Sequence, residues 1–215
     1  KLIIRILDMC SAVLIATIKD IVLIITAIAA AVVACMGLGT WKRQLKGNYE
    51  YELSRRMLVT LYKYRDAIDG VRHPAVWRHE MPSPPVEEAT KMNADEIQHY
   101  GTTIAYQNRW EKVNKEKASL YPDILESKAL WGIELMGLID EVYKLEKELL
   151  EKVRRHLNLI DPKISTTEKD AIRKFYDAQG DILYDDLSDE GDQFKNTLRS
   201  KTKLIEDYLK PKLNY

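Results

Sequence analysis

The chain has 215 residues, with 33 Lys and Arg residues against 33 Asp and Glu residues. This balance argues against a nucleic-acid-binding protein, because such proteins carry a strong basic excess that neutralises phosphates. The two cysteines both lie in the apolar N-terminal part, and they are too few for a disulfide scaffold or a four-ligand zinc site. Residues 1–41 carry five charged side chains, whereas the remaining 174 residues carry 30 basic and 31 acidic groups. The composition therefore predicts an apolar N-terminal region followed by a neutral, hydrophilic one.

Residues 21–41 form an uncharged run of 21 residues that ends at Trp41. At about 1.5 Å per residue, a helix of this length covers roughly 30 Å, the thickness of the hydrocarbon core of a bilayer. A buried core helix rarely stays free of charge for so long, and the run is too long for a cleaved signal peptide. We therefore predict a transmembrane helix over residues 21–41.

The residues after this run predict its boundary and its orientation. Trp41 has the amphipathic ring that is typical of the headgroup layer, and Lys42, Arg43 and Lys46 follow it closely. We expect these four residues to lie at the membrane interface, with the lipid bilayer as a partner. Basic residues near the end of the run outnumber those before it by five to three. The positive-inside rule therefore favours a cytoplasmic location for residues 42–215.

Residues 1–20 form a second apolar stretch, which Arg5 and Asp8 interrupt. The uncharged remainder is too short to span a bilayer. Because its charged side chains gather on one face, the stretch is predicted to be an amphipathic helix at the membrane interface. Alternatively, the charged face lines a water-filled lumen in an oligomer, since charges within a membrane usually face protein or water.

Small residues recur every four positions inside the predicted transmembrane helix. They are Ala27, Ala31, Cys35 and Gly39. This spacing places them on one helix face, where small side chains let two helix backbones approach closely. We expect this face to mediate helix association, so that the chain forms a homo-oligomer.

Residues 42–215 show helical periodicity and no alternating strand pattern. A stripe at 3–4 spacing predicts that the membrane helix continues to about Gly70; it consists of Leu53, Met57, Leu61, Tyr64, Ile68 and Val71. A Pro-rich connection is expected at residues 72–93, which hold four of the seven prolines. Asn93 and Glu96 then form a capping box, which predicts a helix from about residue 94 to 120.

The next helix is predicted to begin at residues 121–123, beside Pro122, and to end before Asp161. Its apolar residues alternate four and three apart, as in a coiled coil: Trp131, Leu135, Leu138, Val142, Leu145 and Leu149. We expect Trp131, Leu138 and Leu145 to be buried.

Two more helices are predicted toward the C-terminus. A second capping box, Ser165 and Glu168, opens a helix that is expected to reach about Tyr184. After the acidic turn at residues 185–192, a last helix directs four residues inward: Phe194, Leu198, Ile205 and Leu209. The predicted fold class is therefore all-α, with one transmembrane helix that continues into a cytoplasmic antiparallel bundle of about four or five helices.

Two groups of histidines and acids could bind metal, although a simpler interpretation is available for each. Glu96 and His99 have the spacing of a di-iron motif, but a di-iron site needs this motif twice and the chain has it once. His73, His79 and Glu80 could supply three zinc ligands, but their spacing matches no zinc motif.

The acidic run at residues 185–192 does not fit a calcium-binding loop. If the loop starts at Asp186, Thr197 stands where a bidentate Glu is required. The run is better interpreted as a solvated turn that caps a helix. The chain has no phosphate-binding glycine loop and no nucleophile motif, so we expect no cofactor and no enzymatic activity.

Five short stretches carry a resemblance to known proteins: WKRQLKG at 41–47, YELSRRML at 51–58, YRDAI at 64–68, VRHP at 71–74 and LWG at 130–132. They resemble a group of bacterial single-pass inner-membrane proteins of unassigned function, mainly over residues 38–75. The resemblance implies a bacterial origin and an inner-membrane location, and it adds no activity.

The function expected is that of a non-enzymatic, membrane-anchored helical scaffold or accessory subunit. It would act through self-association or by binding another membrane or cytoplasmic protein, with no nucleic-acid partner. An alternative is an oligomeric membrane pore or effector built from the N-terminal helices. A third hypothesis is a ligand-sensing or metal-binding helical bundle.

Overall fold

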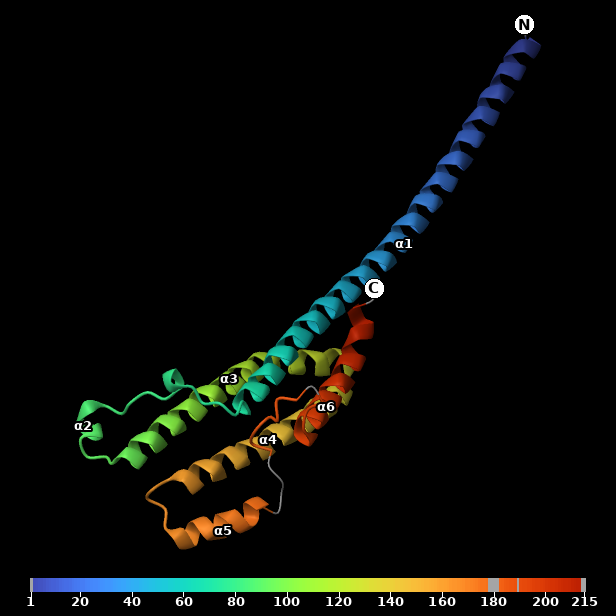
Figure 1. Ribbon diagram of the computed structural model, residues 1–215. Coiled ribbons are helices and arrows are strands. Elements are labelled where there is room, and N and C mark those ends of the chain that lie inside the picture. Colours follow the sequence, from blue (N-terminus) through green and yellow to red (C-terminus); the bar gives the residue numbers. More distant parts are fainter. Residues whose placement is uncertain (1, 178–181, 189, 214–215) are drawn as a thin grey trace. The chain divides into compact units, whose positions relative to one another are not determined.

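The computed structural model describes the backbone of residues 2–177, 182–188 and 190–213. It divides the chain into two compact units, unit 1 (Lys1–Glu50) and unit 2 (Tyr51–Tyr215). The described residues form six α-helices and two short 3-10 helices, and no β-strand occurs among them (Figure 1). The prediction of an all-helical chain is confirmed.

Helix α1 (Leu2–Val71) supplies all of unit 1 and continues into unit 2. It contains a segment that is long and apolar enough to cross a membrane. The 18 most apolar consecutive residues of this segment are all unburied. The helix does not break between residues 1–20 and 21–41, so the backbone marks no boundary there. The side chains of Arg5 and Asp8, on which the pore alternative depends, lie outside the described residues.

In unit 2, α1 buries the whole stripe that the sequence predicts. The buried residues are Leu53, Met57, Leu61, Tyr64, Ile68 and Val71. The helix ends at Val71, one residue after the predicted end. Pro74 explains this end, because a proline disfavours the helical conformation in the residue before it.

The connection between α1 and α3 is Pro-rich, as predicted, and it contains two short helical turns. These are η1 (Arg78–Glu80) and α2 (Val86–Ala89). The turn η1 lies against α3 (Ala94–Trp131).

Helix α3 begins at the predicted capping box and runs further than predicted. The Asn93 side chain accepts a hydrogen bond from the Glu96 N–H, and the Glu96 carboxylate accepts one from the Asn93 N–H, each at 2.9 Å. The predicted end near residue 120 is wrong, since the helix continues through Pro122. A proline inside a helix costs about 3 kcal/mol. Leu120 and Ile124, on either side of it, are both buried, and their burial offsets this cost.

The true boundary between α3 and α4 (Glu134–Ile160) lies at Gly132. This glycine has a φ of 83° and a ψ of −159°, a conformation that is essentially restricted to glycine. The predicted helix that begins at residues 121–123 therefore joins the end of α3 to the whole of α4.

At two positions of α4, the buried residue is the one that follows the residue predicted to be buried. Trp131, Leu138 and Leu145 are only partly buried, so their predicted burial is wrong. Ile139 and Glu146 are buried in their place. The fully buried apolar residues of α4 are Leu135, Ile139, Val142, Leu149 and Val153.

Helix α5 (Thr166–Asp177) begins at the second predicted capping box. The Ser165 hydroxyl accepts a hydrogen bond from the Glu168 N–H at 3.3 Å, and the Glu168 carboxylate accepts one from the Ser165 N–H at 3.2 Å. The predicted extension to Tyr184 is wrong, because residues 182–184 are not helical.

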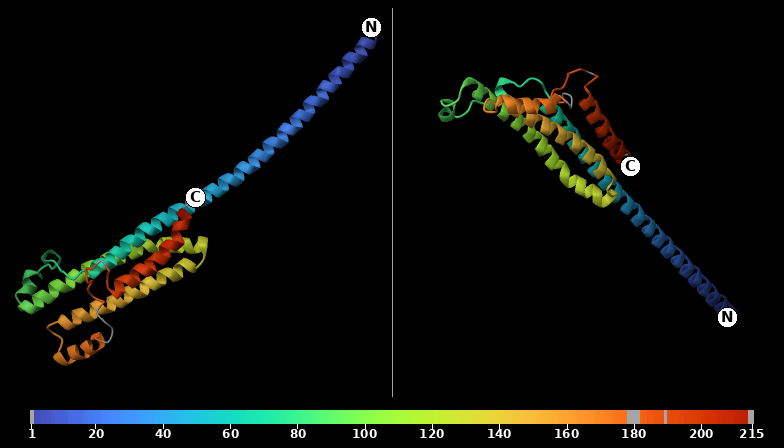
Figure 2. Two further views of the ribbon diagram at one scale, coloured as in Figure 1. Left: turned by 45° about the vertical axis from the view of Figure 1, so that its right-hand side comes forward. Right: turned by 90° about the horizontal axis from the view of Figure 1, so that it is seen from below.

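Helix α6 (Gln193–Leu209) completes unit 2 and is followed by the short turn η2 (Lys210–Leu213). Its predicted inward residues are all buried: Phe194, Leu198, Ile205 and Leu209. In unit 2, α4 contacts α3, α5 and α6 (Figure 2). The buried side chains of α1, α3, α4 and α6 form one hydrophobic core.

Candidate functional site

The residues predicted to lie at a membrane or between helices are all exposed on unit 1. Trp41 is 64% exposed, and Lys42, Arg43 and Lys46 line part of an open hollow on the same helix. The small residues Ala27, Ala31, Cys35 and Gly39 are exposed as well. A Cβ atom added to Gly39 would meet no atom within 4 Å. None of the side chains that the structure describes covers the predicted association face.

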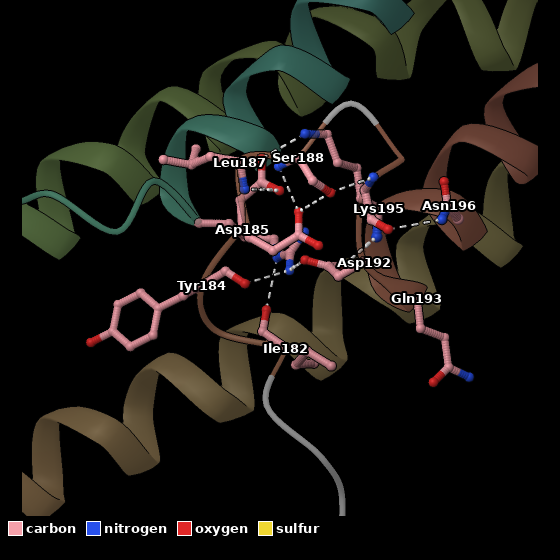
Figure 3. Close-up of polar contacts among 12 residues, drawn as sticks. Ile182, Tyr184, Asp185, Leu187, Ser188, Asp192, Gln193, Lys195 and Asn196 are labelled. Atoms are coloured by element: carbon pink, nitrogen blue, oxygen red, sulfur yellow. Dashed lines mark hydrogen bonds and ion pairs between the residues drawn. The ribbon is translucent and has the colours of Figure 1, made fainter.

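Among the described residues of unit 2, buried charged side chains form several clusters, and the first is centred on Arg72. Figure 3 shows residues that surround it, among them Ile182, Tyr184 and Asp192. Arg72 is 0% exposed. Its Nε donates to the Ile182 carbonyl at 2.8 Å, and its Nη2 donates to the Tyr184 carbonyl at 2.9 Å and to the Asp192 carboxylate. The guanidinium also stacks on the Phe194 ring, 4.6 Å from the ring centroid. The Arg72 side chain therefore binds the carbonyls of Ile182 and Tyr184, in a segment that is not helical.

Two acids around Arg72, Asp185 and Asp192, are paired within the cluster. The Asp192 carboxylate also caps α6, since it accepts from the Lys195 N–H at 2.8 Å. The Lys195 Nζ donates to Asp185 at 2.8 Å, and the Asp185 N–H donates to the Arg72 carbonyl at 2.9 Å. Burial raises the pKa of the nearby Asp69 carboxyl, against the attraction of Arg65, Lys195 and Arg72. The cluster therefore joins the end of α1 to the start of α6.

Three acidic residues of the run at 185–192 lie close enough together to hold a metal ion. Carboxylate oxygens of Asp185, Asp186 and Asp192 lie within 4.8 Å of one another. Arg72 binds Asp192, Lys195 binds Asp185, and the Ser188 hydroxyl and N–H donate to Asp186. A metal ion would compete with these two cations. We therefore interpret the acidic run as a helix-capping turn, as the sequence suggests.

The second cluster is centred on Arg109 of α3, a buried residue that the sequence analysis did not single out. Its Nε and Nη2 donate to the Glu80 carboxylate at 2.9 and 2.8 Å. It also donates to the carbonyls of His73 and Ala75 at 2.9 and 2.7 Å. The hydrogen bonds from Arg109 lower the pKa of Glu80 to about 2, although burial opposes this shift. Arg109 therefore fixes the Pro-rich connection against α3.

This arrangement does not favour the zinc site considered from the sequence. Both Glu80 oxygens accept from Arg109, and the His73 Nδ1 lies 3.1 Å from the Ala75 carbonyl. His79 is exposed. The di-iron motif is likewise used for structure, because the Glu96 carboxylate caps α3. The Nε2 of His99 lies 3.8 Å from a carboxylate oxygen of Asp161, the residue that follows α4.

The third cluster surrounds Glu146, the buried acid of α4. The Tyr64 hydroxyl donates to its Oε2 at 2.7 Å, and the Lys117 Nζ donates to the same oxygen at 2.5 Å. Lys117 lies 4.3 Å from the centroid of the Tyr143 ring, which meets the Tyr64 ring edge-on. Burial, together with the charge of Glu146, raises the pKa of Tyr64 and raises that of Tyr143 to about 12. Both tyrosines therefore stay protonated at neutral pH.

Two cavities on unit 2 are lined by charged side chains. One of about 560 Å³ is bordered by three lysines, one arginine and two glutamates of α4 together with Ile182; these charged residues are Lys144, Lys147, Glu148, Glu151, Lys152 and Arg155. Another of about 430 Å³ lies beside Arg109 and Glu80. Within the described residues, neither cavity brings a nucleophile together with a general base in a catalytic arrangement.

Arg109 and Glu146 are buried charged residues that the sequence pattern did not predict. Glu146 does leave a signal: it falls seven residues after Ile139 and seven before Val153, on the same face of the helix. A charged residue at such a position indicates a buried polar contact. Arg109 leaves no comparable signal, because its partners come from an irregular segment.

Comparison with protein-family models, with curated proteins and with solved structures found no match to this chain. The functional argument therefore depends on the residues themselves.

Proposed function

We propose that this protein is a membrane-anchored helical scaffold that acts through self-association or through binding of a partner protein. The anchor would be residues 21–41, with residues 42–215 in the cytoplasm. Unit 2 would be an antiparallel bundle that is held together by its core and its buried ion pairs. The bacterial inner membrane is the location that the sequence resemblance suggests.

One observation supports this proposal above the others: the apolar part of α1 is uncharged and uncovered. A signal sequence or the core helix of a soluble protein can have the same length and composition. In a core helix, however, the apolar window is mostly buried, and here none of it is. An uncovered apolar surface of this kind is stable in a bilayer. The helix meets the other requirement of a bilayer as well, because its backbone groups are hydrogen-bonded to one another.

The self-association part of the proposal depends on the small residues of unit 1. Ala27, Ala31, Cys35 and Gly39 are exposed along one face, and side chains this small allow a second helix to pack closely. In unit 2, the buried charged groups hold helices of the same chain to one another. Their role is therefore structural, and association is assigned to unit 1.

The test uses the full-length protein and its membrane fraction. We expect the chain to stay in membranes that are washed at alkaline pH. After extraction into mild detergent, it should have the mass of an oligomer by light scattering or native mass spectrometry. Ala31→Ile should weaken this oligomer, because the larger side chain separates the two helix backbones.

The matched control is Ala29→Ile, the same change on the opposite face of the same helix. It should leave the mass unchanged. A chain that alkaline washing releases would contradict the anchor. A monomeric wild type, or equal weakening by both variants, would contradict self-association through this face.

A further inference from the structure

We propose that the turn between α3 and α4 docks on the headgroup layer of the bilayer that holds residues 21–41, as a second membrane contact. This inference rests on the proposed membrane anchor. The turn consists of Gly132 and Ile133 and is taken together with the last two residues of α3, Leu130 and Trp131. This contact would add a part of unit 2 to the membrane-bound surface of the proposed scaffold.

The turn presents apolar side chains at the end of unit 2. Ile133 is 73% exposed and Leu130 is 41% exposed, although both stand beside a well-packed core. Gly132 fixes the sharp turn that projects them, since its φ of 83° and ψ of −159° are accessible only to glycine. Exposed aliphatic side chains gain free energy when they leave water for an apolar environment, and the acyl boundary of a bilayer offers one.

Amphipathic and basic groups surround these aliphatic residues. The Trp131 ring meets the Tyr208 ring edge-on at 6.3 Å, and the Lys212 Nζ lies 4.7 Å from the Trp131 centroid. Lys128 is exposed one helical turn before Gly132, and Glu134 is the acidic residue beside the turn. Trp and Tyr prefer the membrane interface, and lysines there attract anionic headgroups.

The position of the turn along unit 2 follows from its ion pairs. Arg56 of α1 binds Asp123 and Glu126 of α3 at 2.8 and 3.1 Å. Later in α1, Tyr64 shares the Glu146 carboxylate with Lys117, which comes earlier in α3. The two helices therefore run in opposite directions, so the end of α3 lies level with the first residues of α1 in unit 2.

The chain itself limits how far this end can lie from the bilayer. Tyr51, where unit 2 begins, lies ten positions after Trp41, which is at the predicted edge of the membrane. In a helix these positions span about 15 Å. The headgroup layer accounts for several ångströms of that distance, and membrane helices are tilted by about 20° on average. Ile133 can therefore reach the interface through a modest tilt.

A protein partner fits this surface less well than a lipid surface does. A specific protein interface buries roughly 800 Å² on each partner. Two partly exposed aliphatic side chains at the tip of a turn offer far less than that. A bilayer requires no matching shape, and the tether keeps it close to the turn at all times.

The test measures the depth of single labelled residues in vesicles. In a background with Cys10→Ser and Cys35→Ser, an environment-sensitive fluorophore is attached at Ile133→Cys in the full-length protein. The protein is reconstituted in vesicles of phosphatidylcholine and phosphatidylglycerol in equal parts, with or without brominated lipid chains. We expect a blue-shifted emission at Ile133→Cys and loss of most of it to the brominated lipid.

Two matched labels make the outcome decisive. Val86→Cys carries the label on another exposed aliphatic position, 81% exposed, in α2, which precedes the start of α3. Because α3 has 38 residues, its start lies about 55 Å from the turn, and we expect no quenching of a label in the segment before it. Ile28→Cys reports the anchor itself and should be strongly quenched.

Each other result overturns the inference. If Ile28→Cys is quenched and Ile133→Cys is not, the turn does not dock, and the membrane anchor still holds. If Ile28→Cys is not quenched, the anchor fails and the docking fails with it. A blue shift at Ile133→Cys without quenching would show that protein, such as a second copy of the chain, covers the turn. Equal quenching at Val86→Cys would indicate unspecific adsorption of unit 2.

Discussion

Helix α1 carries the same kinds of aliphatic residue through two regions, with opposite outcomes. Ile25, Val33 and Leu38 in unit 1 are exposed, whereas Leu61 and Ile68 in unit 2 are buried. The composition of the residues cannot explain this difference. Their spacing does: residues 21–41 of α1 are apolar on every face, and residues 51–71 of α1 are apolar along one stripe.

This contrast is what the proposed anchor requires, with one part of α1 in a bilayer and the other in water. An apolar stripe is covered by the helices that pack on it, so that unit 2 completes its own core. A helix that is apolar on all sides needs a surrounding apolar phase instead. Charged residues differ between the two regions as well: residues 21–41 have none, whereas unit 2 has buried ion pairs that join its segments. The predictions below test this division from the strongest expected effect to the weakest.

The largest effect is expected from Arg72→Met. The change leaves the Asp192 carboxylate and two carbonyls without their donor in a buried site. Breaking a buried ion pair by removing one partner costs about 3–5 kcal/mol. Denaturant unfolding of the full-length protein in mild detergent, followed by circular dichroism, should show this loss.

Arg173→Met is the control, since Arg173 pairs with Asp170 on the exposed surface of α5. An exposed pair contributes about 0–1 kcal/mol, so this variant should unfold almost like the wild type. Equal effects of the two variants would mean that the Arg72 cluster does not hold unit 2 together.

The second effect compares one substitution in the two regions. Leu149→Ala empties part of the core at a residue that is 0% exposed, and it should cost about 2–5 kcal/mol. Leu38→Ala makes the same change in unit 1 at a residue that is 64% exposed, and it should leave the denaturant midpoint of unit 2 unchanged. A lower midpoint with Leu38→Ala would show that unit 1 contributes to the stability of unit 2.

The sequence predicted the parts of this fold that depend on a short-range pattern. Both capping boxes, the end of α1 and the inward residues of α6 are confirmed, because each is set by residues within a few positions of one another. The sequence also placed the apolar segment of α1. Whether that segment lies in a membrane stays a prediction.

The errors occur where distant residues decide the local structure. Pro122 does not end α3, because buried neighbours on both sides favour the helix. Residues 182–184 leave the helical conformation because Arg72, more than one hundred positions away, binds their carbonyls. Glu146 occupies a core position because Tyr64 and Lys117 satisfy its charge. None of these partners can be identified from the spacing of nearby residues.

The smallest effect concerns pH and the Pro-rich connection. Arg109 lowers the pKa of Glu80 in the folded protein to about 2, from an ordinary value of 4.5. A lowered pKa means that the folded state binds this proton less readily than the unfolded state. The contribution of Glu80 to stability is therefore complete above about pH 4.5, and it is lost as the pH falls toward 2.

Glu80→Gln should remove this part of the pH dependence. At neutral pH the variant should be less stable than the wild type, because the buried Arg109 loses its ionised partner. As the pH falls below about 4.5, the difference between the two should narrow, since the wild type gradually loses the same interaction. The measurement is the denaturant midpoint of both proteins from neutral pH to pH 3, with Glu168→Gln as a control at an exposed acid. A constant difference across this range would show that Arg109 and Glu80 do not form the ion pair on which the connection depends.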